Sequence, residues 1–196
     1  MQFNELEVKR KLFHLICGLI IVILVDLGIF NSLILGIILI LGIITSLLNK
    51  KIEIPVFYWL LKQMDRKDDL KNKPGNGAIY FIAGCLLSLI LFEKNTALAS
   101  IMILSIGDAV GSLIGIHFGR IKHPLNKKKL IEGTIAGIIL SFVGAVIFVN
   151  YKEAFFGAVI GMIVESIELR YKNFVVNDNL TIPLFSGLAI YLLRII

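Results

Sequence analysis

The chain has 196 residues, of which 57% are apolar and 17% are charged, and its mean hydropathy is +0.88. Soluble domains average about 45–50% apolar and about 25% charged residues, and a water-soluble globule of this size could not hide so much apolar surface. The composition excludes a soluble cytoplasmic enzyme, a secreted domain and a disordered chain, and it predicts an all-α membrane protein.

Seven apolar stretches follow one another along the chain. They cover residues 12–25, 32–48, 77–92, 97–116, 133–149, 154–167 and 181–196. Most are shorter than the ~20 residues that cross a bilayer upright, so several must include flanking residues. We predict a polytopic bundle of about seven transmembrane helices, with residues 1–196 forming a single membrane-embedded catalytic domain.

The positive charges fall mainly on one side of these helices. Of the 20 Lys and Arg residues, 17 precede the first stretch or lie in the loops at about 49–76, 117–132 and 168–180. This asymmetry is the positive-inside pattern, so we expect the N-terminus and the three loops in the cytosol and the C-terminus outside. The net charge of +6 therefore reflects topology and indicates no nucleic-acid partner.

Within the 49–76 loop, the apolar and aromatic run 54–61 predicts a helix that lies at the membrane interface. Pro55 is suited to its first position, and Trp59 is suited to anchoring it at the interface. Residues 73–77 then predict a tight turn into the next stretch. Cys17 and Cys85 lie inside apolar stretches, and we interpret both as packing residues.

Acidic residues stand where lipid should be. Asp108 lies inside 97–116, and Glu165 lies inside 154–167, with Glu168 one helical turn further on. A charge at membrane depth costs a few kcal/mol, so such residues are functional candidates. The alternative is a buried acid that only pairs with a Lys of a neighbouring helix.

Glycines line one side of the helix that carries Asp108. Gly107, Gly111, Gly115 and Gly119 recur every four residues. This spacing favours close helix packing, and it also allows a phosphate chain to approach the backbone. The two interpretations are compatible.

The loop after this helix is rich in cations, namely Arg120, Lys122, Lys127, Lys128 and Lys129. They lie between Asp108 and Glu132, at the ends of two successive stretches. Topology alone can explain them. Acids that hold a divalent metal beside several cations are, however, the expected pocket for a nucleoside triphosphate.

Two further cytosolic segments contribute candidates. Asp178 lies at the end of the loop before the last stretch, where it can cap the helix or face the same pocket, and Asn179 follows it. At the other end of the chain, Arg10 and Lys11 are topogenic charges with His14 beside them at the interface.

Taken together, these segments resemble the family of dolichol kinases, CTP-dependent diacylglycerol kinases and phytol kinases. The resemblance rests on the runs 10–14, 73–78, 107–119, 128–134 and 178–183. The central run, from Gly107-Asp108 to Glu132-Gly133, is the most specific, and related phosphatidate cytidylyltransferases share it.

The resemblance implies an integral membrane kinase that transfers the γ-phosphoryl group of CTP to the hydroxyl of a lipid alcohol, with Mg²⁺ as cofactor. Asp108 would hold Mg²⁺, with Glu132 or Asp178 as a second anchor. Asp178 or Glu165 would accept the proton of the alcohol. The active site would face the cytosol.

The remaining expected roles concern the triphosphate. Its charge would be neutralised by Arg120, Lys122, Lys128 and Lys129. Gly107, Gly111 and Gly115 would allow it to approach the helix, and Arg10, Lys11, His14 and Asn179 would be accessory. Two alternatives stay open, a cytidylyltransferase that makes a CDP-lipid and a small ion-coupled transporter that uses Asp108 and Glu165 as a relay. The sequence leaves the lipid alcohol and the oligomeric state open.

Overall fold

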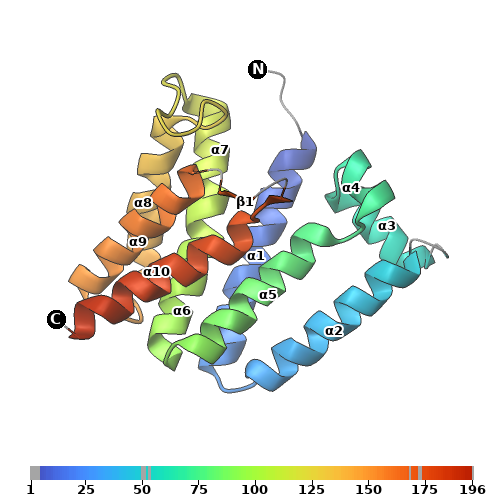
Figure 1. Cartoon of the computed structure of the whole chain (residues 1–196), viewed down its shortest axis with the longest axis horizontal. Coiled ribbons are helices and arrows are strands. Elements are labelled where there is room, and N and C mark those ends of the chain that lie inside the picture. The colour runs from blue at the N-terminus through green and yellow to red at the C-terminus, as the bar shows by residue number, and fades with distance from the viewer. Residues whose placement is uncertain (1–4, 50–51, 53, 168, 172–173, 196) are drawn as a thin grey trace.

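The computed structural model describes residues 5–49, 52, 54–167, 169–171 and 174–195, and these residues are mostly helical (Figure 1). The helices are α1 (Glu5–Asp26), α2 (Ser32–Asn49), α3 (Pro55–Met64), α4 (Lys67–Asn72), α5 (Asn76–Leu91), α6 (Lys94–Met102), α7 (Ala109–Phe118), α8 (Ile131–Ala145), α9 (Tyr151–Ser166) and α10 (Asp178–Ile195). A π-helical segment, η1 (Ile103–Asp108), joins α6 to α7. The all-α prediction is confirmed.

The non-helical ordered structure is small. The strands β1 (Arg170–Tyr171) and β2 (Phe174–Val175) pair antiparallel just before α10. Glu168, which the sequence placed on the same face as Glu165, lies outside the described residues.

Each of the seven apolar stretches overlaps a helix of the bundle. Two of them, α2 and the rod Lys94–Phe118 formed by α6, η1 and α7, are long and apolar enough to cross a membrane. The helix α2 exposes much of its apolar surface, for example Ile37, Ile40 and Leu41. Because water would not stabilise such a surface, this exposure fits a lipid environment. The number of spans and their orientation remain predictions.

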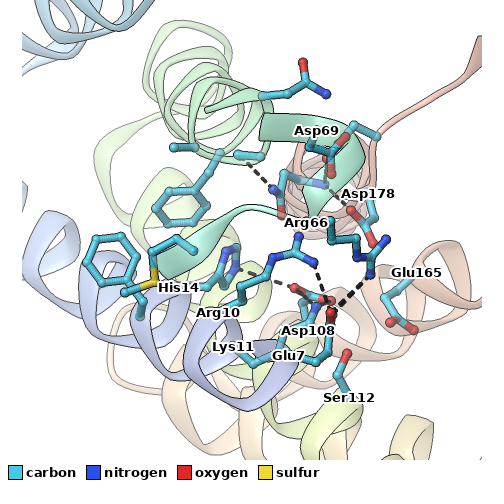
Figure 2. Close-up of a pocket in the computed structure, with 18 of the residues that line it drawn as sticks. Glu7, Arg10, Lys11, His14, Arg66, Asp69, Asp108, Ser112, Glu165 and Asp178 are labelled. Atoms are coloured by element: carbon cyan, nitrogen blue, oxygen red, sulfur yellow. Dashed lines mark hydrogen bonds and ion pairs between the residues drawn. The ribbon is translucent and has the colours of Figure 1, made fainter. Parts of the chain in front are cut away.

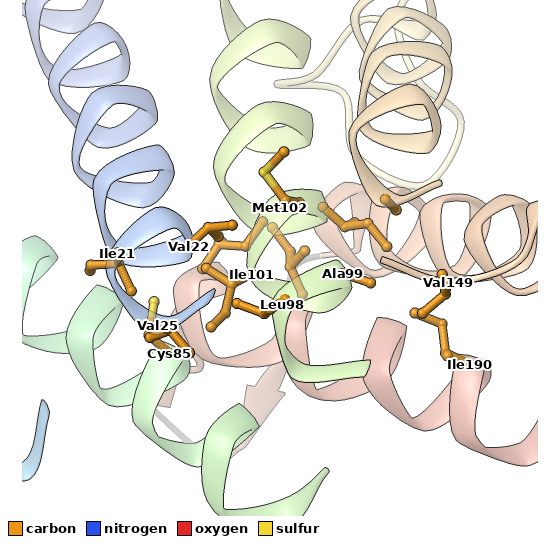
Figure 3. Close-up of a cluster of buried hydrophobic side chains, with 14 of the residues drawn as sticks. Ile21, Val22, Val25, Cys85, Leu98, Ala99, Ile101, Met102, Val149 and Ile190 are labelled. Atoms are coloured by element: carbon orange, nitrogen blue, oxygen red, sulfur yellow. The ribbon is translucent and has the colours of Figure 1, made fainter. Parts of the chain in front are cut away.

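The first half of the rod forms the centre of the bundle (Figure 3). Leu98, Ile101 and Ile103 are fully buried, and Val22 and Val25 of α1 belong to the same apolar cluster. Cys85 of α5 is also fully buried there, so its interpretation as a packing residue is confirmed. This packing fixes the rod against α1, α5, α9 and α10, and the rod in turn positions Asp108.

The predicted interface helix is α3, which begins at Pro55 and leaves Trp59 exposed. A turn after α4 then leads into α5, where Gly75 adopts a positive φ of 73°. The backbone N–H of Gly75 donates to Asp65 Oδ2 at 2.7 Å. Burial raises the pKa of the Asp65 carboxyl, and the Gly75 hydrogen bond opposes that rise. This hydrogen bond holds the connection between α3 and α4 beside the start of α5.

Candidate active site

A cavity of about 850 Å³ lies at the end of the bundle where α1, α3, α4, α5, α7 and the start of α10 meet (Figure 2). One part of its lining is charged, with Glu7, Arg10, Lys11, Asp65, Arg66, Asp69, Asp108, Lys128, Lys129, Glu165 and Asp178. Another part is apolar, with Phe13, Phe57, Leu60, Leu61, Met64, Phe81, Ile82, Ile116 and Leu130. A cavity of this size with both kinds of wall suits a polar ligand together with a hydrocarbon one.

Lys11 and Asp108 form the centre of the charged part. Lys11 Nζ donates to both carboxylate oxygens of Asp108 at 2.6 Å. The Asp108 residue is 3% exposed, so this ion pair is well shielded from solvent. Asp108 is the last residue of η1, and π-helical segments are frequent at functional sites.

His14 lies one turn beyond Lys11 on α1 and faces the same carboxylate. Its Nε2 is 3.7 Å from Asp108 Oδ2, and its ring packs against Phe81 at 4.4 Å between centroids. Among the described residues, this buried Nε2 has no hydrogen-bond partner. The imidazole therefore presents a polar atom to the cavity beside Asp108.

A second buried ion pair joins the cation-rich loop to α9. Lys129 pairs with Glu165, which is 5% exposed. The sequence left open the alternative that each buried acid only pairs with a Lys of a neighbouring element. Both Asp108 and Glu165 do form such a pair, with Lys11 and with Lys129. Both acids also line the cavity, so pairing does not remove them from the site.

Glu7 was not among the predicted site residues, although it lies one turn before Lys11 on the same face of α1. Its carboxylate accepts from Arg10 Nη1 at 3.0 Å and from Arg66 Nη2 at 3.2 Å. Burial alone would raise the pKa of the Glu7 carboxyl, but Arg10, Arg66 and Lys11 outweigh it and hold that pKa below its ordinary value. The i, i+3 and i+4 spacing of Glu7, Arg10 and Lys11 was the signal that could have identified it.

The last helix brings its predicted residues to the cavity. Asp178 and Asn179 begin α10, and both line the cavity. Asn179 Nδ2 donates to the backbone oxygen of Gly77 at 3.2 Å, which ties the start of α10 to the start of α5. The approach is close, because a Cβ at Gly84 would lie 2.0 Å from the Asn179 oxygen.

The glycine stripe packs the rod against α8. A Cβ built on Gly111 would lie 3.2 Å from the Gly133 oxygen, and one on Gly133 would lie 2.3 Å from the Gly111 oxygen. Gly111 and Gly115 also line the cavity. The packing interpretation is confirmed for these two, and the phosphate interpretation stays a prediction. Gly107 lies against Met162 of α9 and is not part of the cavity lining.

Glu132, Arg120 and Lys122 lie away from the cavity lining. Glu132 Oε1 instead accepts from the backbone N–H groups of Arg120 at 2.8 Å and Ile121 at 3.1 Å. Together with the bond from its own backbone N–H, these bonds lower the pKa of the Glu132 carboxyl. In this geometry Glu132 holds the loop between α7 and α8 rather than facing Asp108.

A magnesium site was predicted among these acids. Within the described part of the chain, no group of three or more His, Cys, Asp or Glu side chains is arranged to hold a metal ion. Asp108 and Asp178 do line the same cavity. Mg²⁺ is often bound by one or two carboxylates together with substrate phosphates, and these two acids fit that donor set.

Comparison with known proteins identifies relatives along most of the chain. It is 30% identical over 181 residues to an uncharacterised protein of Methanocaldococcus jannaschii, covering 90% of this chain and 88% of that protein. It is 29% identical over 202 residues to the chloroplastic farnesol kinase of Arabidopsis thaliana, covering 94% of this chain and 64% of that protein. It is 25% identical over 213 residues to the CTP-dependent diacylglycerol kinase 1 of Saccharomyces cerevisiae, covering 93% of this chain and 71% of that protein.

The chain is distantly homologous, at about 25–30% identity, to CTP-dependent diacylglycerol kinase and to farnesol and phytol kinases over most of its length. Probable phytol kinases of Glycine max and Oryza sativa also match, at 28% and 27% identity. No family model matches the chain, and no solved structure matches it. The farnesol kinase alignment spans 94% of this chain, so this homology covers nearly all of the bundle. The resemblance inferred from its motifs is confirmed.

Proposed function

We propose that this protein is a CTP-dependent kinase of a lipid alcohol, such as a dolichol-like polyprenol or diacylglycerol. It transfers the γ-phosphoryl group of CTP to the alcohol hydroxyl. We further propose that it is a multi-pass membrane protein whose cavity faces the cytosol. The observation that carries the proposal is the cavity itself, in which the Lys11–Asp108 pair lies beside an apolar wall.

The polar part of the cavity is suited to a triphosphate. Phosphoryl transfer depends mainly on positioning and on neutralising charge. Lys128 and Lys129 come from the loop before α8, and Arg10 and Lys11 come from α1, so two separate elements supply cations for the phosphates. Gly111 also lines the cavity, so a phosphate beside the rod could approach its backbone.

The acids have separate proposed roles. Asp108 and Asp178 would hold Mg²⁺, which when bound neutralises phosphate charge. Glu165 or Asp178 accepts the proton of the alcohol, because both lie in the cavity that would hold the reacting groups. For Gly107, Arg120, Lys122 and Glu132, the cavity gives no support to the predicted nucleotide or metal contacts.

The test uses the purified protein in lipid vesicles with CTP labelled at the γ-phosphate. We expect the label in the lipid product when a panel of prenols, polyprenols and diacylglycerol is offered. Labelled pyrophosphate in the presence of phosphatidate would instead identify a cytidylyltransferase. Absence of label in every lipid would contradict the kinase proposal.

A further inference from the structure

A second, apolar cavity adjoins the candidate active site. It has a volume of about 160 Å³ and lies between α2, α3 and α5. Its lining consists of Ile38, Leu39, Gly42, Phe57, Leu61, Gly75, Ala78, Ile79 and Ile82. We call this cavity the α2–α5 groove.

The groove and the active-site cavity share a wall. Phe57, Leu61, Ala78 and Ile82 line both of them. The charged side chains lie only on the active-site side, since the groove is lined by apolar residues and glycine. A molecule that reaches across this wall would therefore have a polar end near Asp108 and an apolar end in the groove.

The outer wall of the groove is α2, an apolar helix that is largely exposed. Ile38 and Leu39 of α2 are half-buried against the groove, whereas Ile37, Ile40 and Leu41 of the same helix are exposed. If α2 borders lipid, the groove is one helix away from the bilayer. A hydrocarbon chain that enters the groove then leaves lipid for another apolar environment, so it gains little from the exclusion of water. The shape of the groove would therefore determine which chains bind.

The size of the groove limits what enters it. Cavities that enclose whole drug-sized ligands measure about 300–1,000 Å³, so about 160 Å³ suits a segment of one chain. We propose that the α2–α5 groove holds the hydrocarbon chain of a single-chain lipid alcohol whose hydroxyl lies in the active-site cavity. This inference rests on the proposed kinase function and adds where the acceptor binds and which class of acceptor fits.

Gly42 provides a direct test. It lines the groove but not the active-site cavity, and a Cβ built on it would lie 4.0 Å from Ile79 Cγ1. Gly42→Phe therefore fills the groove beyond the shared wall. The matched control is Gly36→Phe on the same helix, because a Cβ at Gly36 has nothing within 4 Å and Gly36 is not in the groove lining.

The measurement is kcat/KM with γ-labelled CTP and geraniol, farnesol and geranylgeraniol as acceptors of increasing length. Because the Phe side chain would occupy the space that a longer chain needs, we expect Gly42→Phe to lower the ratio of kcat/KM for the longest acceptor to kcat/KM for the shortest about tenfold. Gly36→Phe should keep the wild-type ratio. Ile79→Ala enlarges the groove, and we expect it to shift the ratio the opposite way.

The outcomes separate the two proposals. Wild-type protein that phosphorylates no alcohol contradicts the kinase function itself. Active wild-type protein whose length preference stays unchanged in both Gly42→Phe and Ile79→Ala overturns the groove assignment alone. Equal losses for diacylglycerol and all three prenols in Gly42→Phe would also overturn the assignment, and Ile79→Ala decides the question if Gly42→Phe does not fold.

Discussion

At Asp108, one carboxylate receives a lysine from α1 and lies close to a histidine from the same helix. Lys11 donates to both of its oxygens, and His14 Nε2 is 3.7 Å away. The sequence identified Asp108 as a candidate because a charge at membrane depth is energetically costly. It identified Lys11 and His14 because they belong to a motif that resembles the kinase family. Their meeting was not predictable, because Lys11 and Asp108 are 97 positions apart in the sequence and no local pattern signals contact over such a separation.

We expect Asp108→Asn to lower kcat at least about 100-fold, because it removes a full charge from the centre of a site that acts by electrostatics. The matched control is Glu132→Gln, since Glu132 lies outside the cavity lining and should keep most activity. Phosphorylation of the lipid acceptor by each folded variant is the measurement. Comparable rates for Asp108→Asn and wild type would refute a catalytic role for this carboxylate.

The two lysines of the cation-rich loop that the sequence treated alike differ in the structure. Lys128 lines the cavity and Lys122 does not. A hydrogen bond to a charged group contributes about 1.5–3 kcal/mol, so Lys128→Ala should raise the KM for CTP about tenfold or more. Lys122→Ala should leave this KM unchanged. If both variants show the same KM, the phosphates bind elsewhere.

At the scale of elements, hydrophobic patterning predicted the long helices well and the short ones unevenly. The seven apolar stretches and the interface helix α3 were predicted because apolar runs and Pro55 are local signals. The helix α4, the strands before α10 and the π-helical η1 were not. The wide turn of η1 depends on tertiary packing that no local pattern of residues 103–108 reveals.

The contact between α1 and the Lys67–Asn72 region depends on Glu7, which accepts from Arg10 and from Arg66 just before α4. Because the folded pKa of Glu7 is lowered, its stabilisation is present above the ordinary pKa of about 4.3 and is lost as pH falls through the folded value. We expect Glu7→Gln to cost at most about 1 kcal/mol at pH near 7.

Thermal unfolding in detergent at several pH values tests this contribution. Glu7→Gln should unfold at a lower temperature than wild type at neutral pH. The difference should disappear in acid below the folded pKa, where wild-type Glu7 is itself protonated. A difference that persists unchanged in acid would show that the ion pair is not its cause.

At the scale of the whole molecule, the two ends of the bundle differ in charge. The cavity end carries Arg10, Lys11 and Arg66 together with the cation-rich loop. At the other end, Lys94 pairs with Asp26 at 3.3 Å, and Arg194 pairs with Glu153 at 2.8 Å and with Glu93. Cations at the cavity end are paired with acids too, so the two ends differ in the number of their cations: 17 of the 20 Lys and Arg residues belong to the N-terminal segment and the three predicted cytosolic loops.

This asymmetry leads to a prediction about orientation. We expect the N-terminus on the cytosolic side and the C-terminus on the opposite side of a bacterial inner membrane. Alkaline phosphatase fused after the last residue should be active, and green fluorescent protein at the same place should be dark. Fluorescence at the C-terminus would contradict an odd number of spans with a cytosolic N-terminus.

The π-helical segment has a consequence for how this bundle tolerates change. The rod packs against α5 and α10 through α6 and against α8 through α7, and η1 lies where these partners change. A π-helical turn holds one residue more than an α-helical turn, so deletion of one residue from η1 would restore a continuous α-helix without turning one half of the rod against the other. Insertion of a further residue would instead rotate α7 relative to α6 by roughly 100°. Asp108 and the glycines that follow it would then face different neighbours. The segment should therefore tolerate the loss of one residue better than the gain of one, because only the gain changes the angular phase between the two halves.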